Sequence, residues 1–140
     1  MRTYKDNAKE YALKLLKRKN YFIKELYIKL LNRYSVEEVD NTIRDLIKMD
    51  LLNDKLLIEM KTYFLLHIKM YGRNYIYNYF ISRGLSENLV KYILSKYSNS
   101  IFINNLNRIK RDLDRKGRSP EYIYNFLLRR GYTEEEIKNM

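Results

Sequence analysis

The sequence contains no cysteine, one histidine, one proline and four glycines among its 140 residues. The absence of cysteine excludes disulfide bonds, zinc sites built on thiolates and thiol nucleophiles. The single histidine, His67, argues against a histidine-rich metal site and against a Ser-His-Asp triad. Charged residues interrupt every apolar run before the roughly 18 residues that a membrane span requires, and the first 30 residues lack the apolar segment of a secretory signal. We therefore expect a cytoplasmic protein without a membrane segment, a bound metal or a cofactor.

The residues that are present favour a folded, helical protein. Hydrophobic residues make up 46% of the chain and the mean hydropathy is −0.57, values typical of a folded and water-soluble protein rather than a disordered one. Glycine and proline are scarce, and apolar residues recur nearly everywhere with a spacing close to 3.6. The sequence therefore predicts an all-α fold.

One pattern of apolar, basic and helix-capping residues occurs three times along the chain. The copies lie 50 or 51 residues apart and then 47 residues apart, and they read Leu26-Leu30-Arg33-Ser35, Ile76-Phe80-Arg83-Ser86 and Ile123-Leu127-Arg130-Thr133. Such a period is typical of a protein built from repeated helical units. We predict three tandem three-helix repeats, spanning residues 1–52, 53–98 and 99–140, with a short last helix. Because small repeats are stabilised by packing on their neighbours, we expect them to form a short, elongated and slightly curved rod.

The same pattern predicts how the helices begin and which faces they bury. Ser35 with Glu38, and Thr133 with Glu136, form capping boxes in which each side chain accepts a hydrogen bond from the other residue's backbone. His67 falls on an expected buried face, so we interpret it as a packed side chain rather than a ligand or a proton-transfer group. The expected buried faces are Val36, Val39, Ile43 and Leu46; Leu57, Met60, Phe64 and Ile68; and Phe102, Leu106, Ile109 and Leu113.

The charge is strongly positive and unevenly distributed. Lysine and arginine number 28 against 17 acidic residues, which gives a formal charge of +11. Residues 1–34 hold ten basic and three acidic residues, whereas residues 35–54 hold two basic and six acidic ones. Acidic residues gather where the third helix of each repeat begins, and basic residues gather on the first and second helices. This separation predicts one basic side of the molecule and a polyanionic partner.

Basic clusters on two of the expected helices are the candidate contact residues. The first cluster is Lys14, Lys17, Arg18 and Lys19, and the second is Arg108, Arg111, Arg115, Lys116 and Arg118. A second tier consists of Arg33, Arg73, Arg83, Arg129 and Arg130, of which Arg83 and Arg130 could instead serve a helix end. For any one of these residues, the alternative is an ordinary solvated helix face.

Aromatic and catalytic chemistry receive less support. Tyr75, Tyr77, Tyr122 and Tyr124 could stack on exposed bases, but their helical spacing favours half-buried packing. The sequence contains no glycine-rich phosphate loop, no paired-carboxylate pattern and no nucleophile constellation. We therefore do not expect an enzyme.

Several short motifs, taken in order, resemble those of the RecX family of recombinase regulators. They are the helix Ala8-Lys9-Glu10-Tyr11-Ala12-Leu13-Lys14-Leu15-Leu16, then Ile23-Lys24-Glu25-Leu26, the junction Leu51-Leu52-Asn53-Asp54, Tyr71-Gly72-Arg73, and Arg129-Arg130-Gly131-Tyr132-Thr133-Glu134. The resemblance covers about residues 7–138, although no glycine separates Arg33 from Tyr34, and Leu85 stands where the family often has an aromatic residue.

The resemblance implies a non-enzymatic regulator of the RecA recombinase in DNA recombination and repair, within the SOS response. Such proteins bind RecA and its filament on single-stranded DNA, and they inhibit filament extension, ATP hydrolysis and strand exchange. Two alternatives remain open: a free-standing protein that binds duplex DNA, and an adaptor for an acidic protein partner. The acidic starts of the third helices disfavour duplex binding, because they would repel phosphate. Self-repulsion of a basic molecule leads us to expect a monomer.

Overall fold

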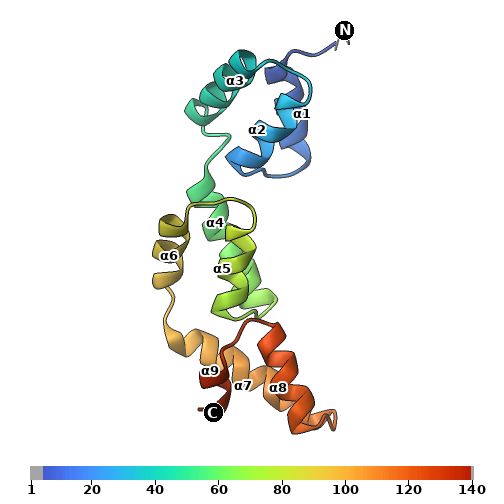
Figure 1. Ribbon diagram of the computed structural model, residues 1–140, viewed down its shortest axis with the longest axis vertical. Helices are drawn as coiled ribbons and strands as arrows, with labels where there is room; N and C mark the ends of the chain where they lie inside the picture. The colour runs from blue at the N-terminus through green and yellow to red at the C-terminus, as the bar shows by residue number, and fades with distance from the viewer. Residues whose placement is uncertain (1–4, 140) are drawn as a thin grey trace. The chain divides into compact units, whose positions relative to one another are not determined.

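The computed structural model describes residues 5–139, in which helices joined by short loops form the structure and no strand occurs (Figure 1). The all-α prediction is therefore confirmed. The helices are α1 (Ala8–Arg18), α2 (Ile23–Leu31), α3 (Val36–Lys48), α4 (Asp54–Tyr63), α5 (Arg73–Ile81), α6 (Glu87–Ser95), α7 (Asn99–Arg115), α8 (Pro120–Arg129) and α9 (Glu134–Lys138), and a π-helical turn η1 (Phe64–Ile68) continues α4.

The chain divides into two compact units at residues 57 and 58, and each is described by itself. The three repeat boundaries and the rod shape stay predictions. Among the described residues, no helix is both long and apolar enough to cross a bilayer. That part of the chain also holds no group of three side chains suited to bind a metal ion.

Polar side chains cap the starts of several helices, including those of Ser86 and Thr133, which the sequence pattern predicted. Ser86 Oγ accepts a hydrogen bond from the Leu89 amide, and Ser119 Oγ accepts one from the Tyr122 amide. Thr133 forms the complete capping box at α9, because its hydroxyl accepts from the Glu136 amide and the Glu136 carboxylate accepts from the Thr133 amide. These caps satisfy backbone donors that have no partner inside the helix.

The predicted capping box of α3 is only half correct. Ser35 Oγ accepts from the Glu38 amide at 3.2 Å, as expected. The Glu38 carboxylate, however, does not reach back to Ser35 but accepts the Ala8 amide at 2.8 Å, at the start of α1. The sequence pattern could not reveal this donor, because α1 is brought beside α3 only by the fold.

A second distant acid caps α2 in the same way. Asp54 Oδ1 accepts the Ile23 amide at 2.8 Å, although 31 residues separate the two. Partial burial raises the pKa of the Asp54 carboxyl above its usual value, despite the opposing effect of this hydrogen bond. Two carboxylates from later in the sequence, Glu38 and Asp54, therefore cap the starts of α1 and α2 in the first unit.

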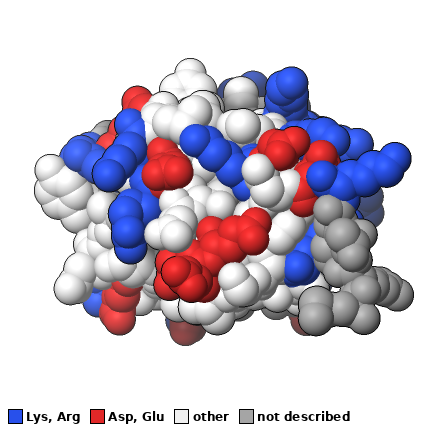
Figure 2. All heavy atoms as spheres, turned by 90° about the horizontal axis from the view of Figure 1, so that it is seen from above, with Lys and Arg blue, Asp and Glu red and all other residues white. Residues whose placement is uncertain are grey.

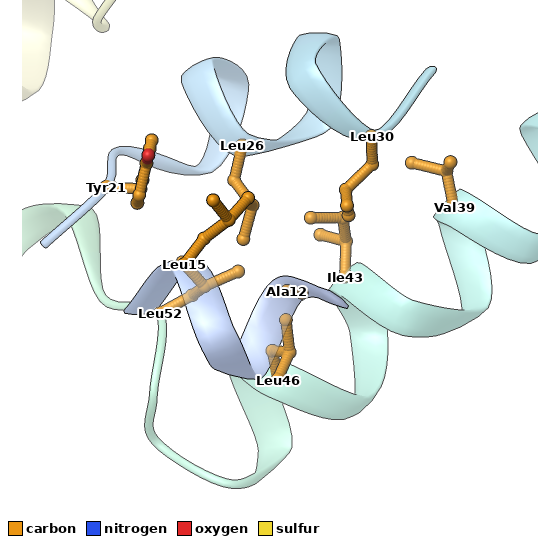
Figure 3. Close-up of a cluster of buried hydrophobic side chains, with 9 residues drawn as sticks. All are labelled: Ala12, Leu15, Tyr21, Leu26, Leu30, Val39, Ile43, Leu46 and Leu52. Carbon is orange, nitrogen blue, oxygen red and sulfur yellow. The ribbon is translucent and has the colours of Figure 1, made fainter. Parts of the chain in front are cut away.

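The first unit is held together by a cluster of apolar side chains from all three of its helices (Figure 3). Its buried members are Ala12, Leu15, Tyr21, Leu26, Leu30, Val39, Ile43, Leu46 and Leu52. Val36 was predicted to belong to the buried face of α3, but it is 58% exposed. Figure 3 shows Val39 at the end of the cluster, so the first turn of α3 extends beyond the core.

The predicted buried face of α4 is largely wrong. Leu57 is buried as expected, but Met60, Phe64 and Ile68 are between 48% and 63% exposed. The residues buried along α4 and η1 are instead Leu57, Ile58, Thr62, Leu65 and Leu66. The helix carries apolar residues on nearly every side, and the polar Thr62 lies in the middle of the side that is buried. Apolar spacing alone therefore favoured the wrong side.

The π-helical turn at the end of α4 is supported by a side chain from α7. Its backbone is wider than an α-helix, with the Lys69 amide donating to the Phe64 carbonyl. Asn105 Nδ2 donates to the Leu66 carbonyl at 2.9 Å. His67 lies on the exposed side of this turn, with its ring 4.5 Å from that of Tyr63. The prediction of a packed histidine is therefore wrong.

Two loops of the second unit meet backbone to backbone. The Gly72 amide donates to the Arg130 carbonyl at 2.7 Å, and the Asn74 amide donates to the Gly131 carbonyl at 3.2 Å. Tyr132, which is 2% exposed, donates its hydroxyl to the Met70 carbonyl at 2.7 Å. Burial strongly raises the pKa of the Tyr132 hydroxyl, so it remains a donor. We call this contact the loop junction, formed by residues 69–74 and 130–132.

Glycine is required at the loop junction because the two backbones approach too closely for a side chain. A Cβ atom on Gly72 would lie 2.4 Å from both the carbonyl carbon and the oxygen of Gly131. Neither atom can rotate away, since both belong to the backbone. Gly131 is doubly constrained, because it has φ +94° and a Cβ atom on it would lie 2.4 Å from the Tyr75 nitrogen.

We expect Gly72→Ala to lower the free energy of unfolding of the second unit by about 3 kcal/mol, because the added methyl group must separate the two loops. Gly117→Ala is the matched control: Gly117 has φ +76° but open space around its Cα, so its substitution should cost only about 1 kcal/mol. Urea unfolding followed by circular dichroism measures both. Equal effects of the two substitutions would contradict a tight loop junction.

Candidate polyanion-binding surface

The basic cluster of α1 lies on the side of the helix opposite the core. Ala12 and Leu15 are buried, whereas Lys14, Lys17 and Arg18 are exposed. Lys14 Nζ donates to Asp6 Oδ2 at 2.7 Å, and this hydrogen bond raises the pKa of Lys14. Part of the charge of Lys14 is therefore already neutralised, while Lys17 and Arg18 form no ion pair with any described residue.

Lys19 ends this cluster just beyond α1. Its side chain is exposed, and its Nζ lies 4.5 Å from the centre of the Tyr21 ring. A cation over a tyrosine ring is attracted by the negative face of the ring. This contact orients Lys19 without removing its charge.

The basic cluster of α7 is positioned in the same manner. Phe102, Leu106, Ile109 and Leu113 are buried, which confirms the predicted stripe. Arg108, Arg111 and Arg115 are exposed and lie roughly 140–200° around the helix from Leu106 at 100° per residue. The core thus directs these three guanidinium groups into solvent.

The members of the α7 cluster differ in how much of their charge is available. Arg115 pairs with Asp112 at 2.5 Å, three residues earlier on the helix. Arg108 and Arg111 form no ion pair within the described part of the chain. Lys116 is exposed where α7 ends, and the exposed Arg118 lies with its Cζ 5.0 Å from the Tyr122 ring centre.

Arg73 is engaged inside the protein. Its guanidinium donates to the Leu94 carbonyl at 2.9 Å, the Tyr97 carbonyl at 3.2 Å and Asn99 Oδ1 at 2.9 Å. It also lies 4.3 Å from the centre of the Phe102 ring. These contacts satisfy carbonyl groups where α6 ends and tie the start of α5 to the start of α7.

Arg130 likewise supports the loop junction. Its Nη2 donates to the Lys69 carbonyl, its Nε is buried without a hydrogen-bond partner, and its Cζ lies 4.2 Å from the Tyr71 ring centre. The remaining second-tier residues Arg33, Arg83 and Arg129 are exposed. Arg33 lies over Tyr11 with its Cζ 4.0 Å from the ring centre.

The tyrosines named from the sequence are mainly packing residues. Tyr75, Tyr77 and Tyr124 are half-buried, and Tyr122 is 38% exposed. Tyr75 stacks on Tyr71 with ring centres 3.7 Å apart and an angle of 7° between the planes. In the sequence, Tyr71 stands out only as part of a family motif, and this contact was not predicted, because Tyr71 lies before α5, outside the helical pattern that includes Tyr75.

Acidic side chains interrupt the positive surface. Figure 2 shows one face of the molecule on which acidic side chains lie among basic ones. Lys91 pairs with Glu87 at 2.8 Å, and Lys138 pairs with Glu134 at 2.6 Å. A single basic side running along the whole chain stays a prediction.

Comparisons with known proteins identify the fold. A scan against protein-family models and a search of curated proteins give no match. The crystal structure of RecX from Lactobacillus salivarius superposes with a TM-score of 0.81 and 21% sequence identity, covering 94% of this chain and 90% of that one. The chain has the RecX fold. A second crystal structure, of regulatory protein RecX, gives a TM-score of 0.78 at 15% identity and covers 95% of this chain and 70% of that one.

We expect substitution of an arginine that is hydrogen-bonded within the protein to affect stability more than substitution of an exposed one. We expect Arg73→Met to lower the free energy of unfolding by about 2–3 kcal/mol, because it leaves buried carbonyl groups without their charged donor. Arg108→Met, on the exposed face of α7, should change it by less than about 0.5 kcal/mol. Chemical unfolding of both variants provides the measurement. Equal stability of the two variants would contradict a structural role for Arg73.

Proposed function

We propose that the protein is a non-enzymatic regulator of the RecA recombinase, which binds RecA and its filament on single-stranded DNA. The main support is the RecX fold, which matches over 94% of this chain. The motifs of the sequence resemble the same family over about residues 7–138. The fold and the motifs point to the same family.

The availability of positive charge supports a polyanionic partner. Lys17, Arg18, Arg108 and Arg111 are exposed and form no ion pair with a described residue, and the net charge is +11. A RecA filament on DNA offers phosphate groups and protein together. Neutralising phosphates releases counterions, which provides affinity at low and moderate salt. We propose that both basic clusters contact DNA phosphate or acidic RecA surface.

We further propose that binding inhibits filament extension, ATP hydrolysis and strand exchange, and that the protein acts as a cytoplasmic monomer.

Acidic side chains in the first turns of α3 favour regulation of RecA over binding to free duplex DNA. Glu37, Glu38 and Asp40 lie in the first turns of α3 and are exposed, so they would repel the phosphates on both sides of a major groove.

We expect the protein to reduce the DNA-dependent ATPase rate of RecA at fixed salt. The combined variant K17Q/R18Q/R108Q/R111Q should weaken this inhibition by at least about tenfold in concentration, because each lost phosphate contact removes counterion release. The R44Q/K48Q variant, whose substitutions lie on the exposed side of α3, is the control for basic residues outside the two clusters. ATP hydrolysis by RecA on single-stranded DNA is the readout.

No change in the ATPase rate at a stoichiometric excess of folded protein would contradict RecA regulation. Tight binding to duplex DNA without RecA would support the duplex-binding alternative instead. Binding to RecA that is insensitive to every basic substitution would favour an adaptor whose contacts lie elsewhere.

A further inference from the structure

A hollow in the second unit lies between α5 and the end of α8. Its volume is about 530 Å³, and its lining residues include Asn74, Asn78, Tyr79, Ser82, Arg83 and Arg129. Its lining contains two arginines and no acidic residue. It therefore combines positive charge with aromatic and amide groups, which is the chemistry that a nucleotide requires.

Arg83 presents a flat cationic surface at this hollow. Its Cζ lies 3.5 Å from the centre of the Tyr79 ring, and its Nη1 donates to the Tyr79 carbonyl at 2.9 Å. The ring and the hydrogen bond together hold the guanidinium, although the side chain is exposed. Nucleic-acid bases stack on arginine planes as they do on aromatic rings.

Arg129 supplies a second and separate charge. It lies in the last turn of α8, is exposed, and forms no ion pair with a described residue. Asn74 and Asn78 add amide groups to the lining, and both are exposed. A phosphate group at Arg129 would therefore meet a donor whose charge is not already neutralised.

The loop junction fixes the backbones of α5 and α8 relative to each other. Asn74 donates its amide to Gly131, which follows Arg129 by two residues, and Gly72 donates its amide to Arg130. The start of α5 and the end of α8 are thus bonded directly through their backbones. The backbone of the site is therefore preorganised, so the entropy cost of binding falls mainly on the Arg129 side chain.

We propose that this hollow binds one nucleotide of single-stranded DNA, with its base against the guanidinium of Arg83 and its phosphodiester at Arg129. The proposal deepens the function proposed above and rests on it for the identity of the polyanion. Single strands fit because paired bases cannot offer their faces for stacking. The hollow therefore contacts a base, whereas the basic clusters on α1 and α7 contact phosphate or acidic protein surface.

The test separates the base contact from the phosphate contact. The anisotropy of two labelled probes is measured across a salt series: an oligothymidylate of about 20 nucleotides, longer than the span of a single small binding site, and an abasic strand of equal length. The variants are R83K, which keeps the charge but loses the flat guanidinium, and R129Q, which loses the charge. R44Q, on the exposed face of α3, is the matched control. Circular dichroism confirms that each variant is folded.

We expect R83K to weaken oligothymidylate binding by at least about fivefold and to leave the abasic probe unchanged, because only the stacking contact is lost. R129Q should weaken both probes and reduce the slope of log affinity against log salt by about 0.7, the value for one phosphate on a single strand. R44Q should bind both probes as the unsubstituted protein does.

Binding of both probes by R83K and R129Q at the unsubstituted level would overturn the proposal, as would a failure of the unsubstituted protein to bind either probe. If those variants bind normally and RecA inhibition persists, the hollow is refuted while RecA regulation stands. If RecA is unaffected but both variants show the expected losses, the hollow stands and RecA regulation is refuted.

Discussion

The close contact between the backbones at Gly72 and Gly131 is the constraint on which the second unit depends. It allows the Gly72 and Asn74 amides to bond to carbonyl groups of the opposite loop, and it buries Tyr132 against Met70. A side chain on either glycine would separate these groups. The same contact fixes the ends of α5 and α8, so the geometry of the hollow between them follows from two residues without side chains.

The basic residues of the chain divide into two populations with different physical roles. Arg73 and Arg130 donate to backbone carbonyl groups and lie over aromatic rings, so they stabilise loops and helix ends. Arg108 and Arg111 point away from a core stripe and have no acidic partner among the described residues. The net charge therefore overstates the charge that is available for a ligand. Burial and hydrogen bonding, rather than residue type, distinguish the two populations.

Local patterns in the sequence were sufficient for the fold class and for most helix ends. Ser86 and Thr133 cap their helices as predicted, because a cap depends only on residues within one turn. The face of α4 was predicted wrongly, since its apolar residues fit more than one stripe. The bond from Glu38 to Ala8 and the contact between Gly72 and Gly131 could not be predicted, because each joins segments that only the fold brings together. The hollow beside Arg83 was likewise not foreseen, since residues from two helices form it.

The proposed function requires that the exposed basic faces of α1 and α7 contact the same polyanionic assembly. Photo-crosslinking on RecA filaments assembled on single-stranded DNA tests it most directly. A photoreactive amino acid replaces Lys17 in one sample, Arg111 in a second and Arg44 as the control in a third. We expect crosslinks to DNA or RecA from the first two positions and few from Arg44. Crosslinks from Arg44 alone, or from none of the three positions when the protein remains on the filament, would contradict it.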